Sequence, residues 1–263
     1  AKNYHRVLSA DVAKLFFAEV YDLSRQEGWT SDEHFTADGT LIASWASLKS
    51  FVRKDGADAA KVQSAKDEDP GNPTINFRGE PRRNDTHQST TDPESVLYRK
   101  ASGKEARLCF GGHILMENRN GLCADFTIHD PIAEPEPVMA LRQAEAHQRL
   151  HQGVQVKTVG ADKNYHRKDF VAGCRERNIV PHVACKEGVK VLGLDGRTTR
   201  KESYRVSQRI RKRVEEIFGW VKTVGGLRRS RYRGKERTQA WGYFVAGTYN
   251  LLRIARLSLA GAR

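Results

Sequence analysis

Residues 105–130, EARLCFGGHILMENRNGLCADFTIHD, decide the fold class of this chain. Two runs of apolar and β-prone residues flank the pair Asn120 and Gly121. An Asn-Gly pair between such runs is a strong signal for a β-hairpin, because the tight turn requires a positive φ at its central positions. We therefore expect two antiparallel strands joined by a turn at residues 118–121.

Helical patterns and short β-prone runs alternate after this hairpin. The predicted helices cover residues 138–151, 168–177, 204–224 and 238–259. The predicted strands cover residues 154–161 and 179–185. A hairpin that leads into such β-α-β-α units predicts an α/β fold, with a mixed sheet and helices packed on it.

The chain before the hairpin adds a helix, a strand and a polar stretch. Apolar side chains at helical spacing predict a helix over residues 9–25, and the sequence HFTADGTLIASWA predicts a strand over residues 34–46. Residues 54–93 are rich in Pro, Gly, Asn, Asp and Lys and show little periodicity. We therefore expect a long polar insertion at about 54–93.

The positive charge of the chain is concentrated in its C-terminal third. The 263 residues carry a formal net charge of +13. Residues 197–237 contain 15 Lys and Arg against 4 Glu, whereas the rest of the chain has 30 bases and 28 acids. An asymmetry this sharp predicts a polyanionic partner for this region, most simply nucleic acid.

Composition also excludes several classes of protein. No apolar run reaches the roughly 18 residues of a membrane-spanning helix, and no Gly-rich phosphate-binding loop occurs, so we expect neither a membrane span nor a nucleotide cofactor. The four cysteines are widely spaced, which excludes a zinc knuckle and favours a reducing compartment. The first residues do not resemble a signal peptide, and we expect a cytoplasmic protein.

Three acidic residues stand out by their positions. Asp38 lies inside the strand predicted over 34–46, Asp162 follows the short strand that ends at residue 161, and Glu215 lies on the long helix. Each has an ordinary explanation by itself: a turn at Asp38, a loop acid and a solvent-facing helix residue. Together they place three carboxylates on elements that can pack side by side, which is what a divalent-metal site for phosphoryl transfer needs.

The helix predicted over residues 204–224 adds cations to this set. Spacings of three, four and seven residues separate successive members of the series Gln208, Arg211, Glu215 and Lys222. These side chains therefore share one face of the helix. The neighbouring Glu216 points about 100° further round and is the weaker candidate for the third acid.

The sequence resembles bacterial insertion-sequence transposases, which carry a DDE catalytic triad on an RNase H-like fold. The resemblance rests on five stretches: HFTADGTLIASWAS, STTDPESVLYRK, GGHILMENRNGL, GADKNYHRKDF and SQRIRKRVEEIFGWVKTVGGLRRSRYRG. It implies that Asp38, Asp162 and Glu215 are the catalytic, metal-binding triad. Arg211 and Lys222 match two positions of the family's tyrosine-arginine-glutamate-lysine signature, whose tyrosine position is Gln208 here.

The resemblance also implies a domain organisation and an activity. Residues 1–30 would be the helical remnant of a truncated N-terminal DNA-binding domain, and residues 31–259 the RNase H-like catalytic domain. The implied reaction is cleavage and strand transfer of double-stranded DNA at insertion-sequence ends, with two Mg²⁺ ions that Mn²⁺ can replace. We expect a homodimer in a synaptic complex, associated with the bacterial nucleoid.

Several interpretations stay open at this point. Further phosphate contacts are expected from Arg209, Arg228, Arg229, Arg231 and Arg233. Residues 87–92 form either a DNA-contacting loop or a plain surface loop, and Trp220 either stacks on a base or packs in the core. His113 and His182 are expected to be hydrogen-bonded histidines of the sheet. Two alternative functions are a catalytically inactive DNA-binding remnant and an RNase H-like nuclease without end specificity.

Overall fold

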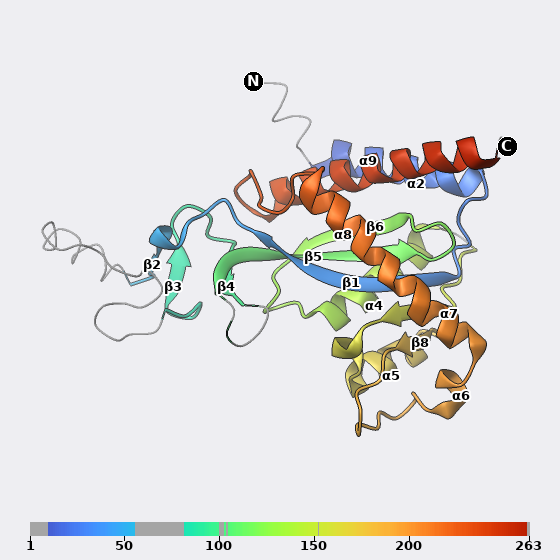
Figure 1. Ribbon diagram of the computed structural model, residues 1–263. Coiled ribbons are helices and arrows are strands. Elements are labelled where there is room, and N and C mark those ends of the chain that lie inside the picture. The colour runs from blue at the N-terminus through green and yellow to red at the C-terminus, as the bar shows by residue number, and fades with distance from the viewer. Residues whose placement is uncertain (1–9, 56–81, 100–102, 104, 152, 262–263) are drawn as a thin grey trace, which may run out of the picture.

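The structure is a computed structural model that describes residues 10–55, 82–99, 103, 105–151 and 153–261 (Figure 1). The strands of its main sheet are β1 (His34–Ala43), β4 (Val96–Tyr98), β5 (Arg107–Glu117), β6 (Cys123–His129), β7 (Thr158–Ala161) and β8 (Val180–Val183). Its longer helices are α2 (Ala10–Gln26), α4 (Glu136–Leu150), α5 (Lys168–Glu176), α7 (Glu202–Ile210), α8 (Val214–Thr223) and α9 (Lys235–Gly261). Shorter elements are η1 (Leu48–Ser50), β2 (Phe51–Arg53), β3 (His87–Ser89), η2 (Lys163–Tyr165), α6 (Gly196–Thr199) and η3 (Arg211–Arg213).

Strand β1 is the centre of a mixed sheet. It pairs antiparallel with β5 along one edge and parallel with β7 along the other, and β8 continues the parallel side. Strands β5 and β6 form the predicted hairpin, with Gly121 in its turn at φ +70°. This sheet, with helices on both faces, confirms the predicted α/β class and its RNase H-like arrangement.

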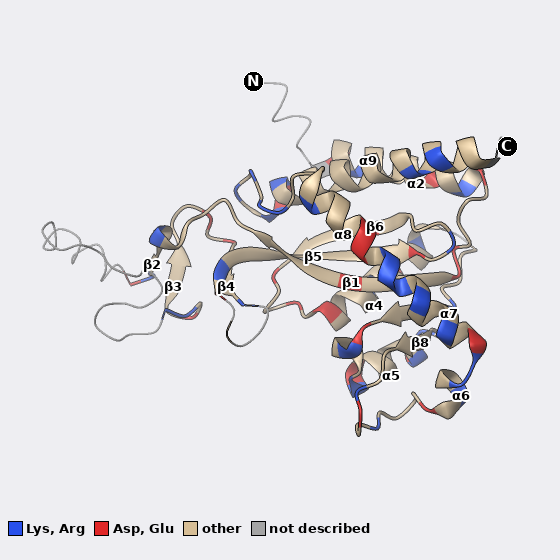
Figure 2. Cartoon of the chain, in the orientation of Figure 1, with Lys and Arg blue, Asp and Glu red and all other residues tan. Residues whose placement is uncertain are grey.

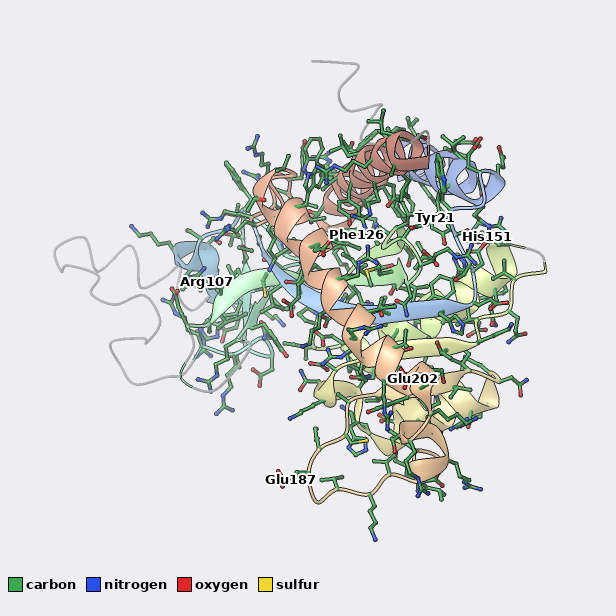
Figure 3. The ribbon with its side chains drawn as sticks, turned by 45° about the vertical axis from the view of Figure 1, so that its right-hand side comes forward. Tyr21, Arg107, Phe126, His151, Glu187 and Glu202 are labelled. Atoms are coloured by element: carbon green, nitrogen blue, oxygen red, sulfur yellow. The ribbon has the colours of Figure 1, made fainter. Side chains whose placement is uncertain are left out.

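Alternate residues of β1 pack in two hydrophobic cores, one on each face of the sheet. Phe35 and Ala37 pack with the residues of α4 and α5 on one face, whereas Ile42 packs with Ile217 and Val221 of α8 on the other. Because side chains alternate along a strand, Thr36, Asp38 and Thr40 lie on the same face as Ile42, toward α8. Figure 3 shows α7 and α8 crossing this face of the sheet, with Glu202 at the start of α7.

The long helix predicted over residues 204–224 is interrupted. A 3-10 turn, η3, separates α7 from α8. Four cations crowd this point of the chain: Arg209, Arg211, Lys212 and Arg213. Like charges three and four residues apart destabilise a continuous α-helix, which gives a physical reason for the break. The other predicted helices and strands appear within a few residues of their expected limits, and α2 lies beside α9 (Figure 1).

Much of the predicted polar insertion, residues 56–81, lies outside the described residues. In the described remainder of that stretch, β3 pairs antiparallel with β2, and His87 and Ser89 are buried. Three-residue strands carry too little periodicity to be recognised from sequence. Among the described helices, none has both the length and the apolar composition needed to cross a bilayer.

Candidate active site

Asp38 lies on β1, and Asp162 directly follows β7, the parallel neighbour of β1, at the same height. The register of β1 and β7 pairs Thr36 with Gly160. Asp38 and Asp162 each follow two residues later in the sequence. The backbone of Asp162 is still extended, with φ −79° and ψ −176°. Since neighbouring strands are about 4.8 Å apart, the register brings these two predicted site residues together.

Local hydrogen bonds orient both carboxylates. Oδ1 of Asp38 accepts from the backbone N–H of Gly39 at 2.8 Å, and Oδ1 of Asp162 accepts from the backbone N–H of Asn164 at 2.7 Å. The second contact caps η2, so the aspartate also begins the next element. Both side chains are half-buried, and these contacts restrict their rotation.

Helix α8 and the turn before it lie over the two strands. The Cβ atom of Arg211 lies 3.7 Å from the position that a Cβ atom would take on Gly160, and Nζ of Lys222 donates to Oγ1 of Thr40. Glu215 lies between these contacts along the helix and is exposed. Helical spacing orients it to the same side as Arg211 and Lys222.

The three predicted carboxylates are not drawn into one cluster. Within the described ranges, no three His, Cys, Asp or Glu side chains are close enough together to hold a metal ion as a group. The register thus places Asp162 at the height of Asp38, whereas Glu215 is exposed on α8.

Glu216 and Trp220 lie on a different side of α8, toward α9. Trp220 packs edge-on against Tyr249, with ring centroids 5.9 Å apart. Burial raises the pKa of Tyr249, and the negative charge of Glu216 contributes to the rise. Glu216 therefore points away from the aspartates, and Trp220 is a packing residue.

Glu136, a carboxylate that the sequence did not predict, packs against β1 at Gly39, on the face opposite to that of Asp38. Glu136, at the start of α4, occupies the space where a side chain at Gly39 would be. Burial raises the pKa of the Tyr165 phenol, and negative charges add to the rise in the order Glu136, Asp38 and Asp162. Gly39 inside a strand was the available signal, because such a glycine often marks the close approach of another group.

A cleft of about 290 Å³ opens at this end of β1. Its lining includes Thr40, Glu136, Asn164 and Arg167. These residues come from β1, from the start of α4 and from the segment that follows Asp162. The cleft borders Glu136 and the segment after Asp162, and neither Asp38 nor Asp162 lines it.

His113 and His182 are hydrogen-bonded core residues, as expected. The ring nitrogens of His113 contact Oε1 of Gln143 at 2.6 Å and Oη of Tyr165 at 2.7 Å, and Nδ1 of His182 contacts Oγ of Ser207 at 2.7 Å. Burial lowers the pKa of His113 to about 3 and that of His182 to about 4. Both rings are consequently neutral at physiological pH.

The predicted DNA-binding arginines lie on two exposed segments. Figure 2 shows cations along α7 and the turn η3 before α8, in front of the sheet. Arg209 is exposed on α7. The others lie in the segment 228–234, here called the arginine loop, where the exposed side chains are those of Arg228, Arg229, Arg231 and Arg233.

The arginine loop is fixed to the end of β1 through its backbone. Ala43 donates to the carbonyl of Arg228 at 3.2 Å, and Ser230 donates to the carbonyl of Ala43 at 2.7 Å. Nε of Arg229 also donates to the carbonyl of Ser44 at 3.0 Å. The backbone is therefore held while most of the positive side chains face solvent.

The stretch around Asp92 holds the other end of this loop. Asp92 is fully buried, and its carboxylate accepts from Oγ of Ser44 at 2.8 Å and from the N–H of Gly234 at 3.1 Å. Glu94 accepts from the N–H of Lys235 at 2.9 Å, at the start of α9. Asp92 thus anchors the arginine loop, a role that neither interpretation of residues 87–92 included.

Residues 82–251 match the family model described as transposase DDE domain. The chain belongs to this family. The match to the transposase DDE domain includes Asp162 and Glu215, whereas Asp38 lies before it. Membership supports a transposase function and the corresponding class of DNA-processing enzyme.

Other comparisons add little to the transposase assignment. No curated protein matches the chain. Among solved structures, the crystal structure of a pre-cleavage Mos1 transpososome is similar at 7% identity and a TM-score of 0.24. The alignment covers 94% of this chain and 62% of that one, so this chain spans less than two thirds of its length.

Proposed function

We propose that this transposase domain cleaves double-stranded DNA at the ends of an insertion sequence and joins the freed ends to a target. Asp38, Asp162 and Glu215 would form its catalytic triad. The observation that supports this most is the parallel register of β1 and β7, from which Asp38 and the residue directly after β7, Asp162, come at the same height. Family membership supports the reaction class.

The donor set fits a hard divalent cation. Carboxylate oxygens are the ligands that Mg²⁺ and Mn²⁺ prefer, and Asp38 within β1 and Asp162 directly after β7 would supply them. Glu215, whose side chain is exposed on α8, would complete the set by turning toward the strands. Two bound ions would supply an activated oxygen nucleophile and stabilisation of the leaving oxygen.

Cations of the chain would hold the DNA around this acidic centre. Arg211 and Lys222 flank Glu215 on its own face of the helix and would bind phosphates, Arg211 through a two-pronged guanidinium and Lys222 as a point charge. Arg209 and the arginine loop would contact the duplex backbone further out. Because strand joining brings two DNA ends together, we also propose a homodimer, acting at the bacterial nucleoid.

Cleavage of supercoiled DNA that contains the element's ends tests this proposal. The wild type should nick it with Mg²⁺ or Mn²⁺ and not with EDTA. Asp38→Asn, Asp162→Asn and Glu215→Gln should each lose about 100-fold or more in rate while still binding DNA, since removal of a metal ligand removes several kcal/mol of transition-state stabilisation. Glu216→Gln is the matched control and should cleave at the wild-type rate.

Other outcomes separate the alternatives. Equal nicking by all variants would contradict the triad. Loss in Glu136→Gln together with full activity in Glu215→Gln would assign the third carboxylate to Glu136. DNA binding without cleavage by the wild type would favour the inactive remnant, and cleavage of any DNA without strand transfer would favour a nuclease.

A further inference from the structure

Gln208 bridges strand β8 and Arg211. Its amide nitrogen donates to the backbone carbonyl of His182, and its amide oxygen accepts from Nε of Arg211 at 2.9 Å. An amide has a donor end and an acceptor end, and here each end faces the partner that it suits. Gln208 thus links the strand directly to this guanidinium.

The contacts around Gln208 close a ring of four neighbours. His182 of β8 pairs in register with Gly160 of β7, and Arg211 lies over Gly160. Gln208 connects His182 back to Arg211. The position of Arg211 is therefore fixed relative to β7, the strand that leads directly into Asp162.

The bridge leaves the charge of Arg211 available. Its Nε is held by a neutral amide, and none of the ion pairs among the described residues involves Arg211. A guanidinium held at Nε still presents its two Nη groups as a fork, which matches two oxygens of a phosphate. A carboxylate at position 208 would instead neutralise that charge.

We propose that Gln208 is a positioning residue, which aims the Nη groups of Arg211 at a phosphate of the DNA bound beside Asp162. This inference rests on the proposed function. It also gives Gln208, at the signature's tyrosine position, a specific role, because one side chain both anchors the helix to β8 and orients the arginine.

A double-mutant cycle with Gln208→Ala and Arg211→Met tests the inference. The affinity for a fluorescein-labelled DNA duplex is measured by anisotropy at several salt concentrations, and the cleavage rate is measured in parallel. Gln208→Ala should weaken binding about tenfold, as expected for loss of a hydrogen bond to a charged group. In the Arg211→Met background, Gln208→Ala should have no further effect, because the guanidinium that it positions is gone.

Ser207→Ala is the matched control, since Ser207 also contacts His182 but not Arg211. It should leave DNA affinity and its salt dependence unchanged. A loss in Ser207→Ala equal to that in Gln208→Ala, or an additive loss in the double mutant, would overturn the inference. If the wild type binds DNA without cleaving it, the proposed function fails, while the binding cycle still decides the role of Gln208.

Discussion

At the scale of single residues, Asp92 stabilises the fold although it lies in a polar stretch of the sequence. It is buried, and its carboxylate accepts from Ser44 and Gly234. Asp92→Ala would leave both donors without an acceptor, at a cost of roughly 1–3 kcal/mol each in the free energy of unfolding. Urea denaturation should show this loss, whereas the exposed Asp85→Ala should change stability by less than about 0.5 kcal/mol. Equal losses in the two variants would contradict the anchoring role.

The buried histidines give the protein a stability that depends on pH. Burial lowers the folded-state pKa of His113 to about 3 and of His182 to about 4, whereas the unfolded value is about 6.5. The unfolded chain therefore binds more protons in this range, so the stabilisation is complete above pH 6.5 and is lost as the pH falls toward 4. Each histidine contributes a slope of up to about 1.4 kcal/mol per pH unit.

Urea titrations between pH 7 and pH 4.5 measure this slope. His113→Gln should reduce the slope of unfolding free energy against pH by up to about 1.4 kcal/mol per pH unit, because the titrating ring is removed. A slope that is the same in the variant and the wild type would show that His113 does not titrate differently in the two states.

At the scale of elements, substitution of two glycines at α8 by alanine should change the free energy of unfolding in opposite directions. Gly219 lies within α8 with nothing within 4 Å of the position of an added Cβ atom. A Cβ atom on Gly225, after the helix, would overlap Val245 and stand 2.7 Å from the carbonyl of Val221. Gly219→Ala should raise the free energy of unfolding by about 0.4–1 kcal/mol, and Gly225→Ala should lower it by roughly 1–3 kcal/mol. Thermal denaturation of both variants checks the pair, and a loss in both would contradict the open position of Gly219.

At the scale of the whole molecule, charge should control the salt dependence of DNA binding. Replacing the arginines of the arginine loop by Gln should lower the slope of log affinity against log salt by about 0.9 for each phosphate that is no longer bound. The control is a triple Gln variant of three exposed arginines that pair with glutamates elsewhere: Arg107, Arg142 and Arg149. In anisotropy titrations, the control variant should have the same slope as the wild type. If the arginine-loop variant and the control variant have equal slopes, the DNA does not bind at the arginine loop.

A feature of this fold can be predicted from the sequence when the residues that form it are close together in the chain. The hairpin was predictable because its turn signal, Asn120-Gly121, lies within the element. Asp38 was found because an acid inside a strand is unusual. The anchoring role of Asp92 was not predictable, because its partners Ser44 and Gly234 are 48 and 142 residues away. Glu136 was missed for the same reason, since only the folded sheet brings α4 to Gly39.

The pairing of β1 with β7 also determines when the two aspartates can come together during synthesis of the chain. His34 and Thr158 are 124 residues apart in the chain, whereas the β5–β6 hairpin is local and such contacts form quickly. On a ribosome, β1 emerges long before its parallel partner exists. A chain that has not been synthesised past residue 162 cannot set Asp162 beside Asp38, so the carboxylate pair is absent from every shorter nascent chain. Under the proposed function, the capacity to cut DNA appears only after synthesis has passed Glu215, the third proposed ligand.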